Sequence, residues 1–306
     1  MNPVAALHAN IGRPLVRGPL ALFPVFTSAV PARRYRTGPA AARRHTLGVR
    51  EDDGGAVVAQ LTITNTDRRP LLLLAGETVL GNRQNRTLNV SVLIAAGTEL
   101  PVPVSCVEQG RWGSARHASR AVHLAPAGIR ATTLSTVHDG LGHGDDVRNA
   151  DQGEVWDQVA AYTTRHGVQA PTMALEDVHA ARAHDVGRLT ASTRPVDGQR
   201  GVIATAGGRV IGLDLFDKPG TLSRYWEGIT GAFALDALSA DESMIGHGRS
   251  DLAAEVEAFL RRTLAADGPA VPGVGEGHEL HLRGDAIDGQ ALVWDGAVIH
   301  LAAFPA

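Results

Sequence analysis

Cysteine and lysine are nearly absent from this 306-residue chain, and each absence excludes classes of protein. The single cysteine, Cys106, rules out an internal disulfide and any cysteine-rich zinc module. The single lysine, Lys218, is not part of a Gly-Lys-Ser/Thr sequence, so a P-loop NTPase is excluded. A Schiff-base enzyme would have to use Lys218, and an isolated charge is more typical of a solvated surface.

Long apolar runs are also missing. The most hydrophobic segment near the N-terminus, residues 19–30, is interrupted by Pro24 and does not resemble a signal peptide. No run approaches the roughly 18 apolar residues that a membrane helix needs. The formal net charge of −3 argues against general binding to nucleic acid or to an acidic membrane. We therefore expect a soluble, cytoplasmic protein.

The residues that are present suit a globular α+β protein. Hydrophobic residues make up 44% and charged residues 20% of the chain, which is enough to build a core. Short apolar or alternating runs, separated by Gly, Pro, Asn and Asp, predict strands at residues 20–27, 47–51, 59–66, 71–80, 87–95 and 100–107. We expect residues 1–125 to form a β-rich domain, an antiparallel sandwich or barrel-like sheet.

Residues 126–306 show a different pattern and predict an α+β domain packed tightly on the first. Apolar residues at helical spacing predict helices at residues 154–166, 174–183, 222–233 and 252–263. Two runs around Ala206-Gly207-Gly208 predict a hairpin. Further strands are expected at residues 121–124, 279–283, 290–294 and 297–304.

The densest group of unusual polar residues lies between Gly76 and Arg86. Gly76 and Gly81 flank Glu77 and allow unusual backbone torsions. If the following segment is one strand, Leu88, Val90, Val92 and Ile94 share an apolar face, and the opposite face is polar. That polar face suits either ligand binding or plain solvation. The binding candidates here are Gln84, Asn85, Arg86 and Asn89.

A second group follows at residues 103–112. Glu108 ends an otherwise apolar row, where partial burial would raise its pKa toward that of a general acid or base. Arg111 and Trp112 are expected to fold over the same rim as binding residues. Cys106 shares its face with valines and reads as a small buried hydrophobe, whereas a nucleophilic role would need a histidine such as His117 or His123 nearby.

Other polar segments carry weaker signals. Residues 138–146 hold two histidines and three aspartates, but the glycine-rich spacing matches no metal motif, so we expect a mobile polar loop and no metal site. Residues 273–277 are a turn cluster, not a dinucleotide fingerprint. His300 is best explained as a satisfied core histidine. No cofactor can be named.

Two polar groups carry a resemblance to a known family. The first contains Gly76-Glu77, Gly81, Gln84-Asn-Arg86 and Asn89, and the second contains Pro103-Val-Ser-Cys-Val-Glu108 and Gly110-Arg-Trp112. Together they resemble the ARG and rhodanese-phosphatase-superfamily-associated protein domain family. Weaker similarities at Gln152, Trp156, residues 212–216 and residues 300–304 extend the resemblance over most of the chain. The resemblance implies a largely uncharacterised prokaryotic family. It makes a nucleotide-like, ADP-ribose-like or phosphate-bearing small ligand an analogy-based expectation.

Three functions follow from these patterns. In the first, a hydrolase or transferase uses Glu77 or Glu108 as general acid or base, with Arg86 and Arg111 holding an anionic group. In the second, the same residues bind a ligand without transforming it. In the third, Glu77, Arg86, Glu108 and Arg111 form an ion-pair network that pins two strands or a homo-oligomer interface. Whether the chain forms a homo-oligomer is left open.

Overall fold

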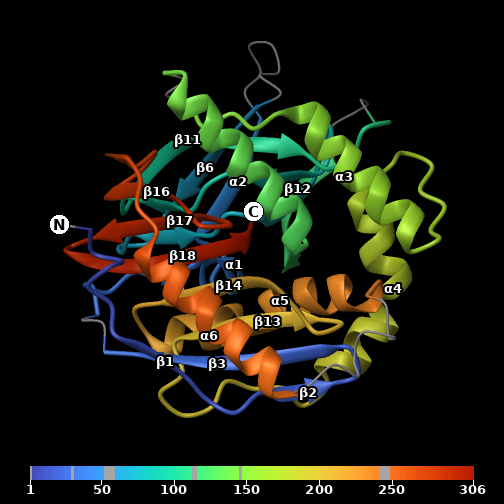
Figure 1. The fold of residues 1–306 in the computed structure, drawn as a ribbon. Coiled ribbons are helices and arrows are strands. Elements are labelled where there is room, and N and C mark those ends of the chain that lie inside the picture. The colour runs from blue at the N-terminus through green and yellow to red at the C-terminus, as the bar shows by residue number, and fades with distance from the viewer. Residues whose placement is uncertain (1, 29–30, 52–58, 112–115, 145–146, 241–248) are drawn as a thin grey trace. The chain divides into compact units, whose positions relative to one another are not determined.

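Antiparallel β-sheet and surrounding helices form an α+β fold in the computed structural model, which describes residues 2–28, 31–51, 59–111, 116–144, 147–240 and 249–306 (Figure 1). The chain divides into two compact units. Unit 1 combines residues 1–33, 185–273 and 277–306, and unit 2 combines residues 34–184 and 274–276.

Unit 1 is built on a nine-stranded sheet in which the order is β1-β3-β13-β14-β18-β17-β16-β15, with β2 also paired to β3. The strands are β1 (Ala9–Ile11), β2 (Leu15–Arg17), β3 (Leu20–Thr27), β13 (Gly201–Ala206), β14 (Arg209–Phe216), β15 (Ala270–Pro272), β16 (His278–Gly284), β17 (Ile287–Trp294) and β18 (Ala297–Pro305). The predicted hairpin is β13–β14, and its turn glycines Gly207 and Gly208 have positive φ angles of 55° and 82°.

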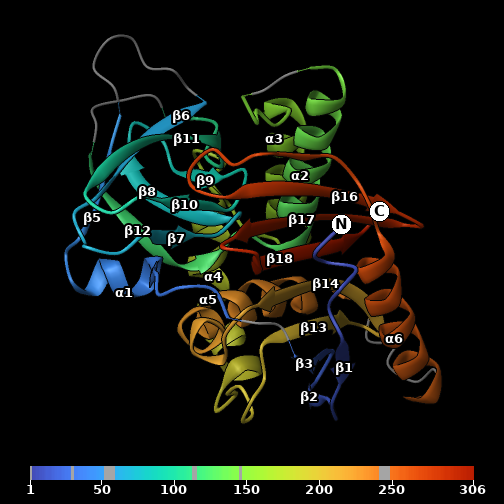
Figure 2. The same cartoon turned by 90° about the vertical axis from the view of Figure 1, so that its left-hand side faces the viewer.

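Two helices pack on this sheet, on opposite faces of β14 (Figure 2). α6 (Arg249–Ala265) places Val256 and Phe259 in a core with Leu215, whereas Tyr225 of α5 (Pro219–Leu238) stacks on the neighbouring residue Phe216. Leu215 and Phe216 are consecutive residues of β14 and point to opposite faces of the sheet, so α6 and α5 lie on opposite faces.

The α5 face of the sheet also carries a row of buried polar side chains. His300 meets Asp214 at 3.0 Å, and His281 meets Glu279 at 2.9 Å. All four side chains are 0–1% exposed. His300 is therefore a satisfied core histidine, as the sequence indicated.

Unit 2 contains a six-stranded sheet in the order β12-β8-β9-β11-β6-β5 and a three-stranded sheet in the order β10-β7-β4. Its elements are β4 (Arg36–Thr37), α1 (Gly38–Arg43), β5 (Leu47–Arg50), β6 (Gln60–Asn65), β7 (Leu71–Leu73), β8 (Glu77–Asn82), β9 (Arg86–Leu88), β10 (Val92–Ile94), β11 (Thr98–Cys106), β12 (Arg116–Leu124), α2 (Ala127–Gly142) and α3 (Gln152–Arg165). α4 (Leu175–Thr190) begins in unit 2, and its residues from Asp185 onward belong to unit 1.

Two predicted strands are each broken in two. Residues 71–80 form β7 and β8, and residues 87–95 form β9 and β10, so the chain passes between the two sheets of unit 2. The breaks brace each other, because Gly76 N–H donates to the Leu88 carbonyl at 2.8 Å and Ala75 N–H donates to Ser91 Oγ at 2.9 Å. Gly76 can make this turn at φ +89° because it has no side chain.

The polar row beside the second break is not a solvated or open face. Leu88, Val90, Val92 and Ile94 enter one core, as expected. The opposite row, however, is also buried: Thr87, Asn89 and Ser91 are 1–2% exposed. Alternation identified the two faces correctly, but it could not show that the second face is covered.

α2 is a helix that the sequence analysis did not predict. Ile129, Thr133, Leu134 and Val137 are buried at helical spacing, and this weak apolar stripe was obscured by the surrounding Gly, Ser and His. The expected loop at 138–146 is therefore wrong as far as Gly142, while Asp145 and Asp146 lie outside the described residues.

The expected domain boundary near residue 125 lies inside unit 2, between β12 and α2. Ala125 N–H donates to the Gly76 carbonyl at 2.7 Å, and Ala125 packs with Ile129 of α2. A division into 1–125 and 126–306 stays a prediction. In the described part of the chain, no helix is both long and apolar enough to cross a membrane.

Candidate functional site

Arg86 is buried to 1% exposure, and an internal carboxylate holds it. Its Nη2 lies 2.8 Å from Glu51 Oε1, and its Nη1 donates to the Gln60 carbonyl at 3.1 Å. The guanidinium was expected to bind the carboxylate or phosphate group of a ligand, and in the structure it pairs with the carboxylate of Glu51. The ion pair and this hydrogen bond join the start of β9 to the residue after β5 and to the start of β6.

Glu108 is the most heavily bonded carboxylate of the predicted site. Oε1 accepts from Arg111 Nε at 2.8 Å and from Thr172 Oγ1 at 3.0 Å. Oε2 accepts from Arg111 Nη2 at 2.7 Å and from the Asn85 N–H at 3.0 Å. This bidentate fork closes the turn after β11, and a backbone bridge between Glu108 and Ala174 ties the turn to the start of α4.

The pKa of Glu108 is shifted in the opposite direction to the sequence-based prediction. Burial raises it, but the hydrogen bonds from Arg111, the Asn85 N–H and Thr172 outweigh burial, and the net pKa lies below its ordinary value of 4.5. The carboxylate is therefore held in its charged form near neutral pH. A general acid needs the reverse.

The remaining predicted polar residues have partners within the chain. Glu77, which is 2% exposed, accepts the Leu74 N–H at 2.9 Å and closes the turn at Gly76. Asn89 accepts from Ser105 Oγ at 2.8 Å and donates to the Arg148 carbonyl at 3.0 Å. Gln84 donates to the Gln109 carbonyl at 3.3 Å, and Asn85 Oδ1 accepts from Gly81 N–H and from Arg111. Trp112 lies outside the described residues.

Cys106 is fully buried beside Arg86, its partner across the β9–β11 pair. Burial raises the pKa of its thiol, and the nearby Arg86 only partly opposes that shift. The neutral thiol is the poorer nucleophile, so this environment favours the buried-hydrophobe interpretation. The backbone of Cys106 is held separately, because Gln152 Oε1 accepts its N–H at 2.8 Å and Gln152 Nε2 donates to its carbonyl at 2.9 Å.

The structure thus joins Asn85, Glu108 and Arg111 in one hydrogen-bonded group and places Arg86 next to Cys106. Glu77 and Asn89 serve neighbouring turns instead. Of the two arginines, Arg111 keeps more contact with solvent, since 15% of its side chain is exposed against 1% for Arg86.

A second group of titratable residues lies beside this one, and the sequence analysis did not connect its members. His123 Nε2, near the end of β12, lies 2.8 Å from Glu176 Oε2 in the first turn of α4. The His123 ring stacks on His179 with 3.6 Å between ring centroids. Glu176 and His179 are three residues apart, which puts them on the same side of the helix.

Exposure and charge differ sharply within this group. The side chains of His123 and Glu176 are 22% and 33% exposed. His179 is 8% exposed, and its Nε2 has no hydrogen-bond partner among the described residues. Burial holds the pKa of His179 well below 6.5, and the neighbouring His123 and His166 lower it further, so its ring is neutral near pH 7. Burial also lowers the pKa of His166, helped by Arg182 and Arg165.

Asp177 connects the two groups electrostatically. Burial raises its pKa above 3.8, and the negative charges of Glu108 and Glu176 add to the shift. The segment from Thr172 to His179 links the two pairs, because Thr172 bonds to Glu108 and Glu176 bonds to His123. We call His123, Glu176, Asp177 and His179, together with the Glu108–Arg111 pair, the acid–base cluster.

Part of this cluster could have been found from sequence. Glu176, Asp177 and His179 fall at the start of a predicted helix, where the i, i+3 spacing aligns Glu176 with His179. His123 was considered only as a base for Cys106. Its pairing with α4 depends on a long-range contact that no local pattern encodes. Among the described residues, no group of three or more His, Cys, Asp or Glu side chains is arranged to hold a metal ion.

The fold and this site define an α+β protein in which the partly exposed His123–Glu176 pair accompanies the largely buried Glu108–Arg111 ion pair. The chain belongs to the ARG and Rhodanese-Phosphatase-superfamily-associated Protein domain family, whose sequence model matches residues 8–304. The family's name associates it with proteins of the rhodanese-phosphatase superfamily, which is compatible with a phosphate-related function. No curated protein and no solved structure gives a significant match.

Proposed function

We propose that the chain is a hydrolase or transferase that acts on a phosphate-bearing, nucleotide-derived substrate at the acid–base cluster. The observation that carries this proposal is the 2.8 Å contact between His123 Nε2 and Glu176 Oε2, with both side chains open to solvent. A carboxylate that orients an imidazole is a recurring way to prepare a general base.

In this proposal Glu176 accepts a hydrogen bond from the protonated Nε2 of His123, so that Nδ1 carries the lone pair that can accept a proton. A water or substrate hydroxyl gives its proton to Nδ1 while its oxygen bonds to phosphorus. The bond from phosphorus to the leaving oxygen breaks, and that oxygen takes a proton. Asp177 is the proton donor, because its raised pKa favours the protonated form more than that of an ordinary aspartate.

The other residues of the cluster position this pair. His179 supports one face of the His123 ring and stays neutral, so it adds no charge to the base. Glu108 stays charged and sustains the raised pKa of Asp177. The substrate class rests on the family association and on the partly exposed guanidinium of Arg111.

A second function is favoured by the internal partners of the originally predicted residues. Glu108 and Arg86 each form an ion pair within the chain, and Cys106 is buried. If the acid–base cluster has no turnover, the same surface would serve as a non-catalytic ligand-binding or sensor module. Binding without turnover separates this alternative from the enzyme.

The test is an assay of the purified full chain against ADP-ribose, nucleoside phosphates and p-nitrophenyl phosphate. We expect turnover that falls by about 10²–10⁴-fold in His123→Gln, which removes the base. Asp177→Asn should lower kcat and shift the pH profile, and Glu176→Gln should have an intermediate effect. His184→Gln, an exposed histidine on the same helix, is the matched control.

Full turnover in His123→Gln would overturn the assignment of the base. If the wild type shows no turnover, thermal unfolding with the same compounds decides between the alternatives. A ligand at about 100 times its Kd should add about 2.7 kcal/mol to the free energy of unfolding. A shift in the wild type that is lost in Arg111→Gln would establish the binding module.

A further inference from the structure

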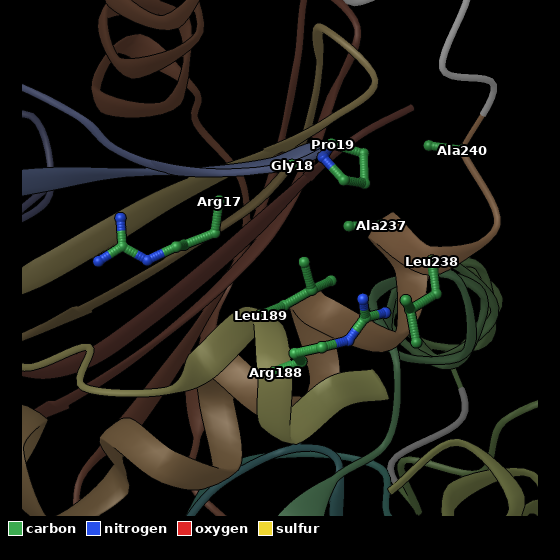
Figure 3. A pocket seen from close by; sticks show the side chains of 8 residues that line it. All are labelled: Arg17, Gly18, Pro19, Arg188, Leu189, Ala237, Leu238 and Ala240. Carbon is green, nitrogen blue, oxygen red and sulfur yellow. The ribbon is translucent and has the colours of Figure 1, made fainter. Parts of the chain in front are cut away.

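Unit 1 contains a cavity of about 550 Å³, and the eight described residues that line it all belong to this unit (Figure 3). The turn between β2 and β3 supplies Arg17, Gly18 and Pro19. The end of α4 supplies Arg188 and Leu189, and the end of α5 with the residues after it completes the wall. This volume lies within the range of about 300–1,000 Å³ in which proteins bind small molecules.

The lining combines apolar walls with positive charge. Pro19, Leu189, Ala237 and Leu238 are apolar, and Arg17 and Arg188 come from separate elements. None of the eight described lining residues is acidic. A guanidinium offers a planar fork of donors that matches the oxygens of carboxylate and phosphate groups. The cavity is therefore complementary to an anion that also carries an apolar body.

Arg188 is available to such an anion. Its Nη2 lies 3.0 Å from Asp185 Oδ1, and the two side chains are 67% and 33% exposed. An exposed pair of this kind contributes little to stability, so a ligand oxyanion can compete with Asp185. Figure 3 shows the Arg188 side chain running toward Leu238. The positive charge of Arg188 also interacts favourably with the C-terminal end of the α5 dipole, but that interaction accounts neither for the cavity nor for Arg17.

Arg17 is the movable partner. In Figure 3 its side chain extends away from the other lining residues. Its Nη1 donates to the carbonyl of the adjacent Val16 at 3.1 Å, an exposed contact within β2. Arg17 is an exposed residue that lines the cavity, so a change of rotamer can release this contact.

We propose that this cavity binds a small organic anion in which a phosphate or carboxylate group is attached to an apolar ring or chain. The oxyanion lies against Arg188, Arg17 closes over it, and the apolar body contacts Leu189 and Leu238. The proposal does not depend on the acid–base cluster, because His123, Glu176 and Asp177 belong to unit 2.

Isothermal titration of the full chain tests this site with phenyl phosphate, hexanoate, inorganic phosphate and hexanol. We expect an organic anion to bind at least ten times more tightly than inorganic phosphate or the neutral alcohol. Whichever of phenyl phosphate and hexanoate binds more tightly shows whether the site prefers a phosphate or a carboxylate group. Arg188→Gln should weaken binding by about tenfold or more, and Arg17→Gln by several-fold.

Arg224→Gln is the control, because Arg224 is an exposed arginine of α5 that bonds to the Gly220 carbonyl of its own helix. Its binding should equal that of the wild type. Equal binding of hexanol and hexanoate, or an equal loss in all three arginine variants, would overturn the proposal. So would a lack of binding by both organic anions. The exposed positions of these arginines make unfolding of the variants an unimportant complication, and thermal unfolding verifies it.

Discussion

Glu108 and Arg86 illustrate, at the scale of single residues, why chemically suggestive side chains need not be catalytic. Both were singled out because carboxylates and guanidiniums carry out chemistry, and both are held by partners within the chain. The residue types that recognise a ligand are the same ones that satisfy each other in a core. Sequence reveals the type, but only the fold reveals whether the partner is internal.

The Glu108–Arg111 pair should therefore matter for stability. We expect Glu108→Gln to lower the free energy of unfolding by about 3 kcal/mol, the low end for a broken buried pair, because Arg111 keeps some contact with solvent. Chemical denaturation measures the change. Arg50→Gln, which loses an exposed pair with Glu99, is the control and should match the wild type. Equal stability of Glu108→Gln and wild type would show that the pair is not structural.

His179 predicts how stability depends on pH. Its folded pKa lies well below 6.5, so between pH 6.5 and that folded pKa the unfolded chain binds the proton more readily. Stability is therefore lost as pH falls from about 6.5, and Glu108 adds a further loss below about 4.5 as its depressed folded pKa is approached.

Denaturant unfolding between pH 7.5 and 5.0 tests this. His179→Phe keeps an aromatic ring against His123 but cannot titrate, so its stability should fall less with decreasing pH. His166, whose pKa is also lowered, should leave a residual slope. An unchanged slope in His179→Phe would contradict the assignment.

Among secondary-structure elements, the sequence predicted most of the long ones. β3 has the predicted bounds, and α5 and α6 contain the residues whose helical spacing was recognised. The failures have two causes. The breaks within residues 71–95 depend on tertiary contacts, such as Ser91 bonding to Ala75, which override local periodicity. α2 was missed because its apolar stripe is weak among Gly, Ser and His.

Gln152 affects a whole strand, because its side chain forms the two hydrogen bonds to Cys106 that a neighbouring strand would otherwise form. β6 pairs with β11 only as far as Pro103, and Ala59 then accepts the Val104 N–H. Alternate N–H groups of a strand point the same way, so the Cys106 N–H faces the side that β6 has left. The Gln152 amide takes up that N–H and the Cys106 carbonyl.

We expect Gln152→Ala to destabilise the chain by about 1–3 kcal/mol, since it leaves two backbone groups without partners. Gln152→Glu should be worse at neutral pH, because a carboxylate oxygen would face the Cys106 carbonyl, and it should recover partly in acid as the carboxyl group gains a proton to donate. Denaturation at pH 7 and pH 5 measures both. Faster amide exchange at Cys106 is the local readout, and unchanged exchange would argue against the clamp.

At the scale of the whole molecule, the two units interleave along the chain. Residues 274–276 belong to unit 2, although the chain on either side of them belongs to unit 1. The amino-acid composition does not mark such a division. The predicted boundary near residue 125 was drawn where strand-rich sequence gives way to helices, and it separates β12 from the helices α2 and α3.

Two fragments test the alternative divisions. We expect residues 34–184 to show cooperative thermal unfolding, because they contain nearly all of unit 2 and lack only residues 274–276. Residues 1–125 should not, because they lack the helices that complete the core around Val107 and Ala125. Cooperative unfolding of the fragment 1–125 alone would support the division drawn from the sequence.

The Gln152 clamp also shows how a β-sheet can end inside a protein. A strand with unpaired N–H and C=O groups is a template for a further strand. At Cys106 the amide group of one side chain bonds to both backbone groups and offers no backbone on which pairing could continue. Cys106 is buried, so the end of this ladder lies in the interior of unit 2. A single glutamine therefore lets the sheet stop within a core while its last backbone groups keep their hydrogen bonds.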